Sequence, residues 1–260
     1  MTTAAALRQA LDTHLSGAGT AWLDAAVQQI GVDPALCAVY SAGAARRCGR
    51  GPLDSAWTVD EAVRALLLSA VAPRHRARVA EDVYTRGDPA ERRAVLKALP
   101  LLEPADRAGG LVLVEDALRT NDATLVAAAL GPFAAEHLPP AALRQAVLKC
   151  AFLSVPFASL AVLDRVDAEL AALLADYACE RVMAGRDVDA QILDLVAAHQ
   201  EVADRLAGFL RELIERDDER ARFRAAAARR AADRLAAAAP AAPAPASASA
   251  SAWRPDPVKE

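Results

Sequence analysis

Apolar residues recur three and four positions apart along most of the chain, in segments of about 12 to 20 residues that short polar turns separate. This spacing places the apolar side chains on one face of an α-helix. No segment between them alternates between apolar and polar residues as a strand would, so we predict an all-α protein. The predicted helices span approximately residues 5–15, 20–30, 34–49, 59–71, 74–86, 89–101, 104–119, 123–136, 140–153, 157–184 and 188–214.

Several helix starts carry capping signals. "TVDE" at Thr58–Glu61 and "DPAE" at Asp88–Glu91 each place a side-chain acceptor at the N-cap and a glutamate three residues later. That glutamate can accept a hydrogen bond from the backbone N–H of the cap residue, as in a capping box. Another helix is expected to start at Asn121 or Asp122, with Asn121 a candidate N-cap.

Antiparallel helix pairs recur roughly every 35 residues, which favours a HEAT-like or TPR-like α-solenoid. The sequence shows no self-similar repeat and lacks the aromatic pattern of TPR proteins, so a compact helical bundle stays open as the alternative. We predict one helical domain over residues 1–214 and a solvated, charged Ala/Arg-rich helical extension over 215–238. The Ala/Pro/Ser-rich residues 239–260 are predicted to be disordered, because they contain too few apolar groups to offset the entropy of ordering.

The charge and hydropathy of the chain indicate which classes of partner it can bind. The net charge of -4 gives no overall attraction to nucleic acid or to an anionic membrane. The N-terminus lacks the continuous apolar core of a secretory signal, and no segment has the length of apolar sequence that a membrane-spanning helix requires. We therefore predict a cytoplasmic protein that does not bind nucleic acid.

Sequence signatures of catalysis are missing. The chain has no GxGxxG, GxxxxGK[ST], GxSxG or HExxH pattern, and its four histidines lie about 60 residues apart. The four cysteines form no CxxC pair, which favours buried thiols over metal ligands. We predict neither a metal site nor a bound cofactor.

One charged cluster interrupts an apolar helix, in "LLADYACERVMAGRDV" at residues 173–188. On a helical wheel Arg181 falls within the apolar stripe, Glu180 beside it and Asp176 at its edge. Arg186 follows near the helix end. These charges are expected to point toward a core, where they would need partners to offset the free energy of desolvation.

Two other segments could supply those partners. On the wheel Lys149 lies between two apolar residues, so it must extend toward solvent or be paired. Arg119 and Thr120 lie at the turn before Asn121. The set forms either a structural salt-bridge network or a ligand site; its members are Arg119, Thr120, Asn121, Lys149, Asp176, Glu180, Arg181 and Arg186.

The same segments carry a family resemblance. "EDALRTND" (115–122), "AVLKCAFLSVPF" (146–157) and "DYACERVMAGRDV" (176–188), in this order after "WTVDEAVRALLL", resemble the EboA family over roughly residues 20–200. The resemblance implies a helical protein encoded in bacterial clusters with small-molecule enzymes and a membrane prenyltransferase, and linked to traffic or export of secondary metabolites. It points to the same polar residues together with Gly185, while Val182 stands where the family commonly has an aromatic residue.

We therefore expect a non-catalytic accessory or scaffold protein that helps to hand on a small secondary metabolite or its precursor. Its expected partners are that metabolite and proteins of the same pathway, and peripheral association with a membrane enzyme is compatible with this role. The alternative is an enzyme acting on a small anionic metabolite. In that case Asp176 or Glu180 would act as acid or base, and Lys149, Arg119 or Arg181 would hold the anionic group.

Overall fold

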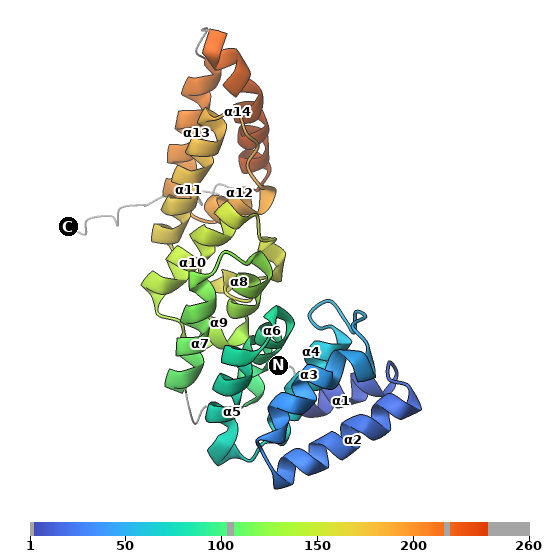
Figure 1. Cartoon of the computed structure of the whole chain (residues 1–260). Coiled ribbons are helices and arrows are strands. Elements are labelled where there is room, and N and C mark those ends of the chain that lie inside the picture. Colours follow the sequence, from blue (N-terminus) through green and yellow to red (C-terminus); the bar gives the residue numbers. More distant parts are fainter. Residues whose placement is uncertain (1–2, 103–106, 216–218, 239–260) are drawn as a thin grey trace, which may run out of the picture. The chain divides into compact units, whose positions relative to one another are not determined.

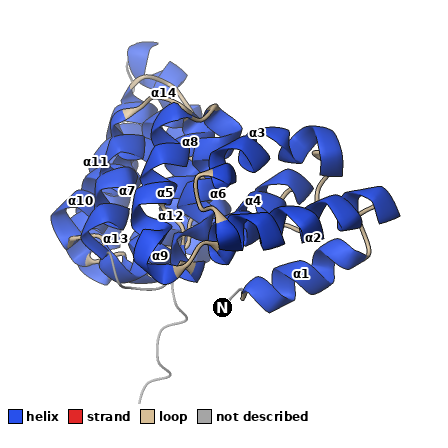
Figure 2. Ribbon diagram, turned by 60° about the horizontal axis from the view of Figure 1, so that its bottom comes forward, coloured by secondary structure: helices blue, strands red, loops and turns tan. Residues whose placement is uncertain are grey.

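A computed structural model describes residues 3–102, 107–215 and 219–238 of the chain (Figure 1). Within these ranges every regular element is helical and none is a strand (Figure 2). The predicted all-α class is confirmed. The α-helices are α1 (Ala4–Asp12), α2 (Gly17–Val32), α3 (Leu36–Cys48), α4 (Val59–Ala70), α5 (Pro73–Arg86), α6 (Pro89–Ala98), α7 (Arg107–Arg119), α8 (Ala123–Ala129), α9 (Pro132–His137), α10 (Pro140–Leu153), α11 (Ala168–Met183), α12 (Ala190–Ala197), α13 (Gln200–Glu215) and α14 (Glu219–Ala238). Short 3-10 turns occur at η1 (Leu99–Leu101), η3 (Phe157–Ser159) and η4 (Leu163–Arg165).

The predicted capping signals operate as expected. Asp88 accepts a hydrogen bond from the backbone N–H of Glu91 at 2.8 Å, and the Glu91 carboxylate accepts one from the backbone N–H of Asp88 at 2.8 Å. Of the two candidates for the start of α8, Asp122 is the N-cap, since it accepts from the backbone N–H groups of Thr124 and Leu125. The N-cap interpretation of Asn121, which is exposed, is therefore wrong.

Three predicted helices are each divided in the structure. The segment 123–136 breaks at Gly131 because Pro132 starts a new helix there. The segment 157–184 begins with two 3-10 turns, and α11 starts only after Asp167, which accepts from the backbone N–H of Leu170 at 2.9 Å. The segment 188–214 ends one helix at Ala197 and begins the next at Gln200 without a proline or glycine to mark the break.

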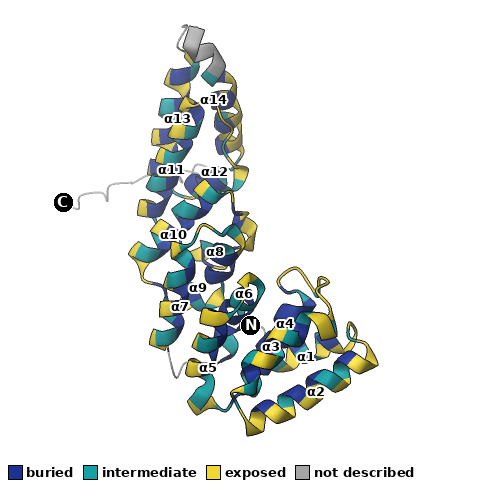
Figure 3. Ribbon diagram, viewed as in Figure 1, coloured by how far each residue is buried: buried dark blue, intermediate teal, exposed yellow. Residues whose placement is uncertain are grey.

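By its contacts the chain divides into two units, Met1–Glu180 and Arg181–Glu260. In the first unit α4, α6, α8 and α10 pack in succession, and α3, α5, α7 and α9 form a second row. Each of α3, α5 and α7 also packs against the helix that follows it, so the chain alternates between two rows, an order that α-solenoids of stacked helix pairs share. Helices α1 and α2 cover α4, which is buried on nearly all sides (Figure 3).

The second unit consists of α12, α13 and α14, which pack against one another. Helix α14 buries one alanine-rich face against the other two, and its arginines Arg230 and Arg234 form ion pairs with Asp187 and Asp194. The helix predicted for this segment is thus present over Glu219–Ala238, where it packs against α12 and α13 instead of being solvated on all sides. Alanines spaced along one face allow two helix backbones to approach closely. Such a face lacks the large apolar side chains by which a buried helix is usually recognised in a sequence.

The structural division falls within α11 rather than after residue 214, the predicted boundary. The predicted disordered tail, 239–260, lies outside the described residues. Among the described helices, none is both long enough and apolar enough to cross a membrane.

Replacing Gly110 with alanine should destabilise the first unit. A Cβ atom built there would lie 2.5 Å from Cζ of Phe133, so the Phe133 ring that packs α9 against α7 would have to shift. We expect the free energy of unfolding to fall by about 1–3 kcal/mol, the usual range for overpacking, as measured by urea denaturation followed by circular dichroism. Gly31→Ala is the control, since a Cβ there meets nothing within 4 Å and should give no loss. Equal effects of the two substitutions would contradict the packing argument.

Candidate functional site

The charged end of α11 does not point into a core. The buried face of this helix contains Leu170, Leu174, Ala178 and Val182, and both Asp176 and Glu180 are exposed. Among the described residues, neither carboxylate takes part in an ion pair. The helical-wheel prediction of the buried face is wrong because it places the large apolar residues in the core, whereas α11 is packed partly through alanines.

Arg181 and Arg186 also depart from the prediction. Arg181 is only half-buried and donates two hydrogen bonds, of 3.1 and 2.9 Å, to the backbone carbonyl of Asp187. This contact holds the turn that ends α11, where Gly185 has a φ of +68°. Arg186 is exposed. The arginine in the predicted apolar stripe therefore acts at the helix terminus.

Arg119 and Lys149, in contrast, are brought together. They line an open groove of about 470 Å³ between α7 and α10, two helices that are not tightly packed against each other. Its lining consists of Glu115, Leu118, Arg119, Ala142, Gln145, Ala146 and Lys149. A groove of this size lies within the range of about 300–1,000 Å³ that is typical of small-molecule sites.

The two cations are held differently. Lys149 is half-buried, and its ammonium group donates a hydrogen bond of 2.9 Å to the backbone carbonyl of Leu118, near the C-terminus of α7. This contact stabilises the helix end, and a lysine has two further N–H donors to offer. Arg119 is exposed and pairs with Asp116 at 3.1 Å, which leaves most of its guanidinium accessible.

The remaining predicted residues of this region lie beside the groove. The Thr120 hydroxyl donates to the carbonyl of Ala117 at 2.8 Å, and neither Thr120 nor Asn121 belongs to the lining. Asp116, which pairs with Arg119, also accepts a hydrogen bond of 3.0 Å from the hydroxyl of Tyr84. Burial and this hydrogen bond raise the pKa of Tyr84 above its ordinary value, so the tyrosine is a neutral donor that fixes Asp116.

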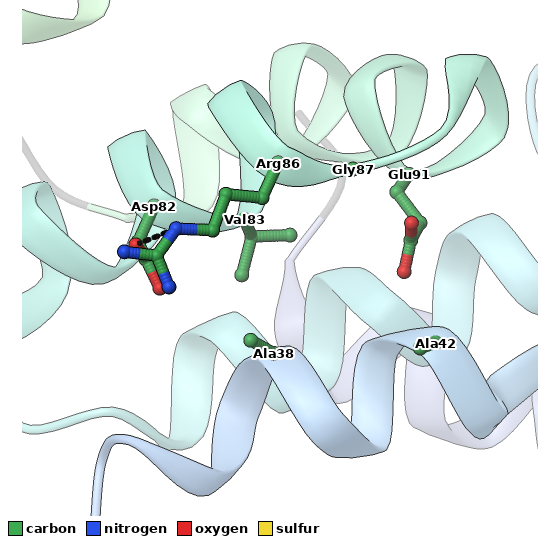
Figure 4. A pocket seen from close by; sticks show the side chains of 7 residues that line it. All are labelled: Ala38, Ala42, Asp82, Val83, Arg86, Gly87 and Glu91. Carbon is green, nitrogen blue, oxygen red and sulfur yellow. Dashed lines mark ion pairs between the residues drawn. The ribbon is translucent and has the colours of Figure 1, made fainter.

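A second depression lies between α3 and the junction of α5 with α6 (Figure 4). At one end Arg86 pairs with Asp82 at 3.0 Å, and at the other end lies Glu91. Val83 lies between them, above Ala38 on α3. The volume of about 120 Å³ suits a few water molecules, each of which takes about 30 Å³. It is too small for a metabolite, so we place the candidate site in the α7–α10 groove.

The main buried charge cluster lies at the start of α4, outside the residues predicted from the sequence. Asp60, Glu61 and Arg64 are 4%, 2% and 2% exposed. Arg64 pairs with Asp60 and donates to the carbonyl of Ser41 at 3.1 Å. The four-residue spacing of Asp60 and Arg64 is the sequence signal for this ion pair, and it overlaps the "TVDE" capping motif.

Glu61 is the centre of this cluster. Its carboxylate pairs with Lys97 at 2.6 Å and with Arg93 at 3.1 Å, and it also accepts from the backbone N–H of Thr58. Burial alone raises the pKa of Glu61, but these contacts, with Lys97 the strongest, outweigh it and lower the pKa below its ordinary value. For Asp60 burial is likewise outweighed, by Thr58 and Arg64, so its pKa is also lowered. Both carboxylates are buried and paired, which indicates a structural role.

No described group of three or more His, Cys, Asp or Glu side chains could hold a metal ion. Comparison with known proteins gives one family. Residues 40–197, more than half of the chain, match the family described as "Metabolite traffic protein EboA". The chain belongs to the EboA family. This membership supports a role in metabolite traffic, and the matched residues include the whole α7–α10 groove. No curated protein and no solved structure matches the chain.

Arg64→Ala should strongly destabilise this EboA protein. It leaves the Asp60 carboxylate buried without its cation, a change that typically lowers the free energy of unfolding by about 3–5 kcal/mol. Arg86→Ala is a matched control, because Arg86 also pairs with an aspartate four residues before it but is 80% exposed at its side chain. We expect a loss below about 1 kcal/mol for the control. Urea denaturation measures both, and a small loss for Arg64→Ala would contradict the structural role.

The cluster should also make stability depend on pH. Because the folded-state pKa values of Asp60 and Glu61 are lowered, their ionised forms stabilise the fold above the unfolded-state pKa of about 4. That contribution is lost as the pH falls through the folded-state values. Urea denaturation between pH 6 and pH 3 should show this loss in the wild type, with a shallower slope in Glu61→Gln. The exposed Glu81→Gln should keep the wild-type slope, and an unchanged slope in Glu61→Gln would count against the assignment.

Proposed function

We propose that this EboA protein is a non-catalytic accessory protein that binds a small secondary metabolite or its precursor in the α7–α10 groove. The observation that carries the proposal is the groove itself, which has metabolite size and whose lining combines the apolar side chains of Leu118, Ala142 and Ala146 with polar and charged groups. It lies within the residues that define membership of a metabolite traffic family. An open groove suits a protein that must both receive and release its cargo.

The placement of the charged side chains favours binding over turnover. The enzyme alternative requires Asp176 or Glu180 beside the cations that hold the substrate. Both carboxylates are exposed on α11, and neither belongs to the lining of the groove that contains Lys149 and Arg119. The alternative would therefore need Glu115, the carboxylate of the groove, to act as the acid or base.

The proposed partners are pathway proteins that supply and accept the metabolite in the cytoplasm, including an enzyme at the membrane surface. The exposed polar residues of the α11 C-terminal turn, among them Arg186, are available for such contacts. In this proposal the helical rows of the first unit present the metabolite, and the protein promotes its transfer or export without changing it.

Filling the groove should abolish metabolite binding. Ala142 lies in the lining and is partly exposed, so Ala142→Trp places an indole within the groove. Native mass spectrometry of the wild type mixed with metabolite extract from the producing cells should reveal a bound small molecule. We expect at least a tenfold loss of occupancy in the variant, equivalent to about 1.4 kcal/mol.

Ala141→Trp is the matched control, since Ala141 is the preceding residue of α10, is exposed and lies outside the lining. It should bind like the wild type. Retention of the metabolite by Ala142→Trp would exclude the groove. If the wild type converts the bound molecule and Glu115→Gln does not, the enzyme alternative is established.

A further inference from the structure

The apolar character of the groove continues beyond its lining residues. Val112 on α7 and Phe152 on α10 are 60% and 62% exposed, which is unusual for large apolar side chains. Val112 lies three residues before Glu115, and Phe152 lies three residues after Lys149, so both project on the helix faces that line the groove. Both helices thus offer apolar contact surface beyond the charged residues of the groove.

Phe152 is held in a defined position. Its ring makes an edge-to-face contact with Tyr177, at 4.9 Å between ring centroids. The hydroxyl of Tyr177 donates a hydrogen bond of 2.9 Å to the backbone carbonyl of Ala151, which orients the tyrosine. An aromatic ring that is both fixed and exposed presents an apolar face to a ligand at low entropic cost.

The lining of the groove holds more positive than negative side chains. Arg119 and Lys149 contribute two positive charges from different helices and Glu115 contributes one negative charge, while Asp116, outside the lining, pairs with Arg119 through one of its guanidinium nitrogens. The two cations can converge on one acidic group, to which hydrogen bonds are stronger than to a neutral group. Glu115 lies on the same face of α7 as Arg119 and would repel a second negative charge.

We infer that the metabolite is an amphipathic organic monoanion. Its single acidic group binds Lys149 and Arg119, and its apolar body lies against Leu118 and Ala146 and extends toward Phe152. The inference rests on the proposed function and adds the chemical class of the cargo. In this arrangement Glu115 selects against dianions.

Two fluorescent probes test the inference on the full chain. 8-Anilinonaphthalene-1-sulfonate is an amphipathic monoanion, and N-phenyl-1-naphthylamine has the same ring system without the sulfonate. Fluorescence titration should show one sulfonate-probe site per wild-type chain. The double variant Arg119→Gln/Lys149→Gln should raise the Kd of this probe about tenfold or more and that of the neutral probe less than about twofold. Glu115→Gln should lower the Kd of the anionic probe about threefold, because it removes a repelling charge.

The controls separate charge recognition from loss of fold. Lys149 also supports the end of α7, so the single variant Arg119→Gln, whose side chain is 68% exposed, is measured beside the double variant. It should fold normally and still weaken the anionic probe selectively. Arg86→Gln, an exposed arginine outside the groove, should bind both probes like the wild type.

Equal losses for both probes, or no loss in either groove variant, would overturn the inference. The same loss in Arg86→Gln would also overturn it. These outcomes differ from failure of the proposed function, in which wild-type protein retains no metabolite from the extract. A neutral metabolite that is retained equally by wild type and Arg119→Gln would uphold the proposed function and refute the monoanion.

Discussion

The buried carboxylate of Glu61 is the interaction on which the first unit most depends. A carboxylate that is only 2% exposed requires partners, because burial of an unpaired charge is strongly unfavourable. Lys97 and Arg93 reach it from α6, and the backbone N–H of Thr58 reaches it from the start of α4. Helix α4 must therefore take a position against α6 in which the carboxylate keeps these partners. Apolar packing between alanine-rich faces would fix this position less specifically.

Polar contacts of the same kind connect successive helices toward the groove. Arg93 also donates to the hydroxyl of Thr124 at 3.4 Å, which joins α6 to α8. Farther along, Arg144 on α10 binds Asp167 through hydrogen bonds of 2.7 and 3.1 Å. This contact lowers the pKa of Asp167 to about 2, and the same carboxylate caps α11. These contacts hold α4, α6 and α8 within one row and fix α10 against the start of α11, and the groove forms where α7 and α10 are not tightly packed.

The contrast between the two charged regions explains the proposed division of roles. In the α4 cluster Asp60, Glu61 and Arg64 are buried, and each is paired within the protein, so little remains for a ligand. In the groove Lys149 uses one donor for the end of α7, and Arg119 is largely exposed. Cations that retain free donors beside an apolar surface are suited to bind a molecule that arrives and leaves, which is what metabolite traffic requires.

The sequence alone determined the helical class, the capping boxes at Thr58 and Asp88, and the family, because these depend on local spacing and on short motifs. It also indicated Arg119 and Lys149. Only the tertiary structure decided which charges are buried. The wheel of α11 placed Arg181 in the core because it weighted large side chains, but α11 packs partly through alanines, and Arg181 holds the Asp187 carbonyl instead.

The same limit applies to α14, where mostly alanines form the packed face, and to Glu61, whose cationic partners lie more than 30 residues away in the chain. Periodicity reports which residues share a helix face. It does not report which neighbouring helix that face meets, nor whether a distant cation reaches the charge upon it. The choice of neighbouring helix and the pairing with a distant cation both depend on how closely the helix backbones approach. The free energy of that approach depends on all the helices that pack together.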